Sequence, residues 1–82
     1  MPQVVEIIGG PGHMDMAYSL FKGNPIVFTL KTGEMLRIVL SSVEMESGSR
    51  ESWNLKGRST SGEYLNKIYY STRQNRGTVS RE

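Results

Sequence analysis

Basic and aromatic side chains alternate in two stretches of the C-terminal third of the chain. The first spans Trp53 to Arg58 (WNLKGR) and the second spans Lys67 to Arg73 (KIYYSTR). Proteins bind single-stranded nucleic acids with cations that follow the phosphates and with aromatic faces on which the bases stack. We therefore predict a nucleic-acid site that consists of Asn54, Lys56, Arg58, Lys67, Tyr69, Tyr70, Arg73 and Arg76.

Each residue type in this set has an expected role. The lysines and arginines would meet phosphate, one of the two tyrosines would stack on a base, and the Asn54 amide would hydrogen-bond a base edge. Arg76 and Gly77 would bring a guanidinium and an uncovered backbone N–H to the same anion. The alternative is structural: Trp53, Ile68 and one tyrosine form core, and the other residues are ordinary surface.

Other kinds of site lack the residues they need. The chain has one histidine, His13, and no cysteine, which leaves a nucleophile–base pair or a zinc ligand set incomplete. Glu44 and Glu46 share one strand face but flank a hairpin tip, where carboxylates are expected to be solvated. The glycines of residues 9–12 match neither G-x-G-x-x-G nor a P-loop, and indicate a flexible linker. The sequence predicts no enzyme, no metal and no cofactor.

The charge is distributed unevenly along the 82 residues, whose net charge is only +2. Residues 54–82 hold six basic and two acidic side chains, a balance that suits a polyanionic partner. The absence of cysteine fits a reducing compartment. No apolar run approaches the roughly 20 residues that span a bilayer. We expect one cytoplasmic domain over residues 1–82 without a membrane partner.

The N-terminal third contains a possible strand and a possible helix. Val4 to Ile8 is rich in β-branched residues and suits a strand, although the sequence leaves open whether residues 1–12 are ordered. Residues 13–22 alternate as a strand would, but they also place apolar side chains on one helical face, and Gly23-Asn24-Pro25 follows as a stop. We favour a short helix, with a strand as the alternative.

From Pro25 onward the pattern predicts strands separated by turns. The apolar positions change parity at Ser41-Ser42, which predicts a bulge or bend in a long strand. The expected strands are Ile26–Lys31, Glu34–Glu46, Ser52–Lys56, Glu63–Thr72 and a stub at Thr78-Val79, with loops at Ser47–Arg50, Gly57–Gly62 and Arg73–Gly77. The expected fold is mainly β: a small antiparallel SH3-like or Sm-like barrel of about five strands with a short N-terminal helix.

The order of these elements from Met14 to Glu44 resembles the Sm-like proteins, the family that includes the bacterial Hfq RNA chaperone. That family has a helix, a strand, a turn with glycine and a long bent strand, and Asn54 and Arg76-Gly77 occupy places similar to its base-holding Asn and its Arg-Gly pair. The chain departs from the family at Ile38-Val39, where a glycine is usual. The resemblance implies RNA binding and a homo-oligomeric ring.

A second function remains open beside nucleic-acid binding. Residues 63–72 carry apolar side chains on both faces of the predicted strand, as expected where a subunit interface covers the outer face. The chain would then be a protein-interaction or structural module within a homo-oligomer or a larger assembly.

Overall fold

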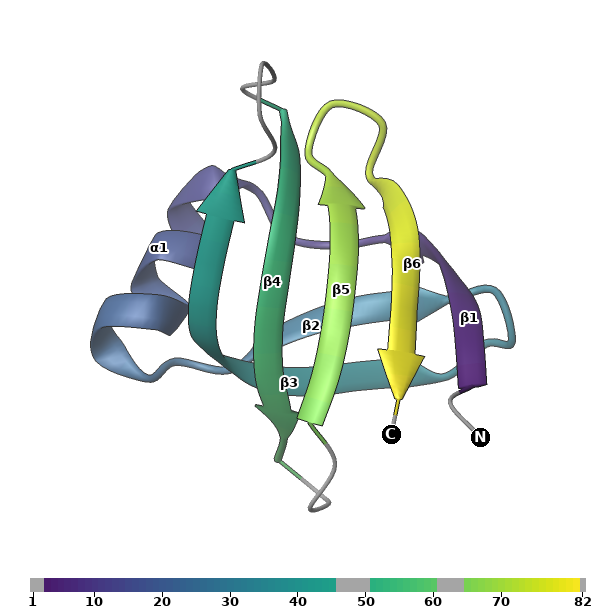
Figure 1. Ribbon diagram of the computed structural model, residues 1–82, viewed down its shortest axis with the longest axis horizontal. Helices are drawn as coiled ribbons and strands as arrows, with labels where there is room; N and C mark the ends of the chain where they lie inside the picture. Colours follow the sequence, from purple (N-terminus) through teal and green to yellow (C-terminus); the bar gives the residue numbers. More distant parts are fainter. Residues whose placement is uncertain (1–2, 46–50, 61–64, 82) are drawn as a thin grey trace.

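The computed structural model describes residues 3–45, 51–60 and 65–81. Over these residues the chain forms β1 (Gln3–Gly9), α1 (His13–Lys22), β2 (Ile26–Leu30), β3 (Met35–Met45), β4 (Ser52–Ser59), β5 (Leu65–Ser71) and β6 (Arg76–Arg81). Each strand pairs antiparallel with the next strand along the chain, and β6 pairs with β1, which closes a barrel (Figure 1). The prediction of a small antiparallel barrel with one short helix is confirmed, with six strands instead of about five.

The additional barrel strand is β1, which confirms the possible strand at Val4 to Ile8 and closes the barrel. It pairs with β6 from Gln3 to Ile7 and with β2 at Ile7 and Gly9. The glycine segment after it is packed at Gly10, where a Cβ atom would lie 2.9 Å from the rings of both Phe28 and Tyr70, and is open at Gly12. The segment that the sequence suggested as a linker is thus part of the barrel wall and its connection to α1.

Residues 13–22 form a helix, as the favoured interpretation predicted. The helix ends at Gly23, whose φ of 73° is left-handed and whose N–H donates to the Ser19 carbonyl oxygen at 3.0 Å. Glycine adopts this conformation without the steric cost that a Cβ atom imposes. Met16 and Ser19 are buried, and they hold α1 against β3 and β2 (Figure 1).

The long strand β3 bends where the sequence predicted. Its register against β4 shifts between Leu40 and Ser42, which marks a bulge. The first half of β3 pairs with β2 and the second half with β4, and Figure 1 shows the strand turning between these two directions. A bulge of this kind lets one strand serve two sides of a small barrel.

Two strands are longer than predicted. β4 continues to Ser59, because Gly57 lets it approach β3 closely: a Cβ atom at this position would lie 2.6 Å from the Val39 carbonyl oxygen. The predicted loop at 57–62 is therefore wrong for its first part, and residues 61–62 lie outside the described residues. β6 is a complete strand paired on both sides, not a stub. The predicted hairpin loop at 47–50 also lies outside the described residues.

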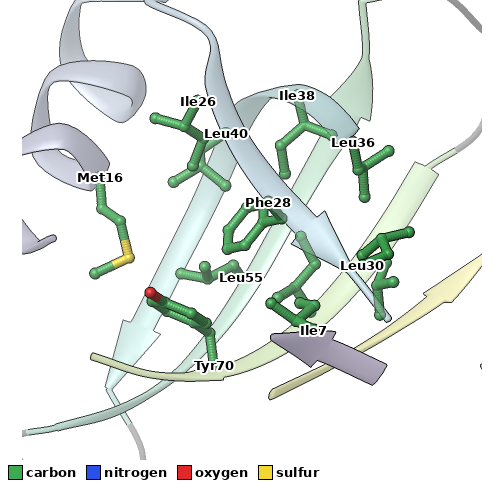
Figure 2. Packing of buried hydrophobic residues seen from close by; sticks show 12 residues of the cluster. Ile7, Met16, Ile26, Phe28, Leu30, Leu36, Ile38, Leu40, Leu55 and Tyr70 are labelled. Atoms are coloured by element: carbon green, nitrogen blue, oxygen red, sulfur yellow. The ribbon is translucent and has the colours of Figure 1, made fainter. Parts of the chain in front are cut away.

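The core fills the barrel with side chains from every strand and from Met16 of α1. It consists of Ile7, Met16, Ile26, Phe28, Leu30, Leu36, Ile38, Leu40, Leu55, Ile68, Tyr70 and Val79. Figure 2 shows Phe28 among these residues, and its ring meets the Tyr70 ring edge to face at a centroid distance of 5.2 Å. In the described part of the chain, no helix is long and apolar enough to span a bilayer.

Candidate nucleic-acid interface

Alternate side chains of β4 point away from the barrel. Leu55 and Gly57 are buried, whereas Asn54, Lys56 and Arg58 between and beside them are exposed. Because successive strand residues point to opposite faces, these three side chains lie on the outer face of the sheet. The predicted polar and basic residues of β4 are therefore brought together as the sequence suggested.

The strand register places the outward residues of β5 and β6 in rows with those of β4. Asn54 is opposite Tyr69, which is opposite Thr78. In the next row Lys56 is opposite Lys67, which is opposite Ser80. We use the term basic face for eight of the outward residues of these strands, namely Asn54, Lys56, Arg58, Lys67, Tyr69, Arg76, Thr78 and Ser80.

The rows of the basic face border a shallow hollow of about 310 Å³. It is an open depression on the sheet, not an enclosed cavity, so a flat or extended ligand could lie along it. Its lining consists of Val4, Ser42, Glu44, Asn54, Leu55, Lys56, Lys67, Ile68, Tyr69, Thr78 and Ser80. Two cations, one carboxylate, an aromatic ring, an amide and three hydroxyls therefore surround one depression.

The two adjacent tyrosines have different positions. Tyr69 points outward and is 44% exposed, so its ring is available for stacking. Tyr70 points into the barrel and is fully buried, so its predicted role in base stacking is wrong. Its hydroxyl donates to the carbonyl oxygen of Pro11 (3.0 Å) or to Asn75 Oδ1 (3.1 Å), and burial raises the pKa of its phenol. Tyr70 is the tyrosine that the structural alternative assigned to the core.

The predicted arginines of the β5–β6 hairpin separate into two environments. Arg76 is exposed and continues the basic face, opposite Ser71. Arg73 lies in the turn outside the rows, and its Nη1 is 3.6 Å from Glu51 Oε2, an exposed ion pair. The predicted anion site at the Gly77 N–H is not supported by its position, because Gly77 is paired with Tyr70 of β5 and with Ile7 of β1.

Two carboxylates border the basic face. Glu44 is opposite Asn54 at one end of the tyrosine row. Glu6 is opposite Thr78 at the other end, and its Oε2 lies 3.5 Å from Lys31 Nζ. These carboxylates give the face an acidic margin. Its positive charge lies at Lys56 and Lys67 and, toward the strand ends, at Arg58 and Arg76.

Trp53 and His13 lie apart from the basic face. Trp53 is half-buried against the core, and its ring meets the His13 ring edge to face, with centroids 5.2 Å apart. His13 is exposed and is the first residue of α1. Among the described residues, no group of three or more His, Cys, Asp or Glu side chains is placed to hold a metal ion.

The predicted site did not include several residues that line the hollow, among them Val4, Thr78 and Ser80. Thr78 and Ser80 reach the hollow because β6 is a full strand beside β5. Val4 reaches the hollow because β1 pairs with β6. Alternation along β6 is visible in the sequence, since Val79 is apolar between two hydroxyl residues. The pairing of β1 with β6 joins the two ends of the chain, and no local pattern encodes it.

Comparison with known proteins found no matching protein-family model, no matching curated protein and no matching solved structure.

Proposed function

We propose that the chain binds single-stranded nucleic acid, RNA in the first place, through the basic face. The observation that carries the proposal is the placement of Lys56 directly opposite Lys67, next to the exposed ring of Tyr69. A phosphate between the two ammonium groups would accept charge-assisted hydrogen bonds from both.

The surroundings of the lysine pair suit the rest of a nucleotide. A base stacked on Tyr69 would lie one row away from the lysines, with the Asn54 amide and the Thr78 hydroxyl on either side. Stacking tolerates any base, because every base has a π-face, while amide and hydroxyl groups can hydrogen-bond base edges. The face therefore combines backbone binding with a stacking platform.

Arg58 and Arg76 extend the positive charge along the strands in both directions from the lysine row. Arg58 is the next outward residue of β4 beyond Lys56, and Arg76 is opposite Ser71, the next outward residue of β5 beyond Tyr69. Outward residues on one strand are about 6.6 Å apart, since each residue rises about 3.3 Å. An extended strand of nucleic acid would meet cations at both ends of the hollow.

The test is fluorescence anisotropy of labelled single-stranded RNA and DNA oligonucleotides at several salt concentrations. Lys56→Gln combined with Lys67→Gln should weaken binding and reduce the log–log salt slope by about 0.7, because the two lysines share one phosphate and each phosphate contact contributes about 0.7 for a single strand. The matched control is Lys22→Gln combined with Lys31→Gln, which removes the same charge outside the basic face. Equal losses for both pairs would show unspecific attraction, and no binding at low salt would refute the proposal.

A relation to Sm-like proteins and a cytoplasmic location remain predictions from the sequence.

A protein-interaction module is the second candidate function. It is favoured by a different observation, the exposed apolar side chains of α1, which lie outside the basic face.

A further inference from the structure

The helix α1 carries apolar side chains on its solvent side as well as on its barrel side. Met16 and Ser19 face the barrel and are buried. On the opposite side Met14 is 67%, Tyr18 43% and Phe21 82% exposed. Residues four and three apart lie on one helical face, so these three side chains form a continuous outer stripe.

We propose that the outer stripe of α1 is the contact between two copies of this chain, packed with their helices antiparallel about a twofold axis. The proposal does not depend on nucleic-acid binding, because the stripe and the basic face share no residue. A twofold axis makes the same patch on both copies meet, so the patch must be complementary to itself. The charges that flank the stripe meet this requirement.

Asp15 lies in the first turn of α1 and Lys22 in the last turn. They are seven residues apart, about two helical turns or roughly 10.5 Å, and they therefore lie on the same flank of the stripe. Antiparallel pairing places Asp15 of one copy beside Lys22 of the second copy, and the symmetry repeats the contact. Parallel pairing about a twofold axis would instead put the charged flanks of the two copies on opposite sides of the contact, where neither charge meets its opposite, and this selects the antiparallel arrangement.

Lys22 is already held at the margin of the stripe. Its Nζ lies over the Tyr18 ring, 4.9 Å from the ring centroid. The alkyl part of the lysine thereby covers apolar surface, while the ammonium group stays at the edge where a second copy would bring its carboxylate. Met14 of one copy would face Phe21 of the other, since an antiparallel pair centred near Tyr18 matches the two ends of the stripe.

The size of the stripe sets the strength of this association. A ten-residue helix is about 15 Å long, and standard interfaces bury about 800 Å² on each partner. Three exposed side chains on such a helix supply less than this area. The dimer is therefore weak and depends on concentration, and it is not a permanent assembly.

Sedimentation velocity of the full chain over a range of concentrations tests the proposal. We expect a monomer–dimer equilibrium that Met14→Ser weakens by at least about tenfold. Met35→Ser is the matched control, because Met35 is 61% exposed at the start of β3 and outside the stripe. A protein that stays monomeric up to about millimolar concentration, or a dimer that both variants weaken equally, overturns the proposal.

A charge exchange tests the antiparallel geometry separately. Asp15→Lys leaves only cations on the flank, and Lys22→Asp leaves only carboxylates, so each variant alone should associate more weakly than the wild type. An equimolar mixture of the two should form a heterodimer, because each copy then offers the charges that the other lacks. Circular dichroism of each variant at low concentration verifies its fold, since both changes oppose the helix dipole. A mixture that associates no better than its components refutes antiparallel pairing.

Discussion

The backbone N–H of Leu40 donates a hydrogen bond to the hydroxyl oxygen of Ser19 at 3.0 Å, and both residues are buried. Leu40 is the last residue before the bulge in β3, where the ladder to β4 loses its regular register. A buried N–H without a partner is costly, and the serine of α1 supplies the partner that the irregular ladder lacks. The helix therefore stabilises the bend that lets β3 serve both sides of the barrel.

Ser19→Ala should destabilise the protein by about 1–3 kcal/mol, because it leaves the buried Leu40 N–H unpaired. The higher helix propensity of alanine offsets about 0.5 kcal/mol of this loss. Ser41→Ala is the matched control: its hydroxyl donates to the Lys56 carbonyl oxygen at 3.2 Å but is exposed, so the change should stay within about 0.5 kcal/mol. Urea unfolding measures both, and equal effects would mean that the buried bond contributes nothing of its own.

Gly77→Ala should destabilise the barrel by about 3 kcal/mol or more. A Cβ atom at this position would overlap the Tyr69 carbonyl oxygen and lie 2.8 Å from the Tyr70 Cα, and the backbone of a paired strand cannot move away cheaply. Gly9→Ala is the control in β1, where a Cβ atom would find only ordinary contact with Thr29 at 3.7 Å. Thermal unfolding of the two variants separates them, and a Gly77 variant as stable as the Gly9 variant would refute the close approach of β6 to β5.

Tyr70→Phe should cost about 1–2 kcal/mol near neutral pH, because it removes the hydroxyl that donates to Pro11 or Asn75 inside the barrel. The cost should depend on pH in a defined direction. Burial raises the pKa of Tyr70 in the folded state, whereas the phenol of the unfolded chain ionises near its ordinary pKa of 10.0. The contribution of Tyr70 is thus fully present below about pH 10 and is lost as the pH rises toward the folded pKa.

The measurement for Tyr70 is the difference in unfolding free energy between the wild type and Tyr70→Phe from about pH 8 to about pH 11. Taking the difference cancels the titration of every other group that both proteins share. The difference should shrink as the pH rises above about 10. A difference that stays constant through this range would show that the Tyr70 phenol ionises in the folded protein as it does in the unfolded chain.

The barrel class could be predicted because its main signals are local. Alternation of apolar and polar residues marked β2 and β3, and the parity change at Ser41-Ser42 marked the bulge. The glycine after Lys22 marked the end of the helix. Each signal depends on neighbours in the sequence, and each was confirmed in the structure.

The strand count and parts of the site could not be predicted because they depend on contacts between distant residues. β1 becomes a barrel strand only through its pairing with β6, where Gln3 is opposite Arg81. Which of Tyr69 and Tyr70 faces outward depends on the register of β5, because adjacent strand residues point to opposite faces. The residue type does not help, because both are tyrosines. The extension of β4 depended on Gly57 fitting against the backbone of β3.

Tyr69 offers the sharpest test of base stacking on the basic face. Tyr69→Leu keeps an apolar side chain on β5 but removes the aromatic face, so the affinity for single-stranded RNA should fall by about 1–3 kcal/mol, or roughly 5-fold to 150-fold. Tyr69→Phe retains the ring and should bind nearly as the wild type does. The salt slope should stay the same in both variants, because neither change alters a charge. Anisotropy titrations measure affinity and slope together, and a Tyr69→Leu protein with unchanged affinity would leave the lysine pair as an electrostatic site without stacking.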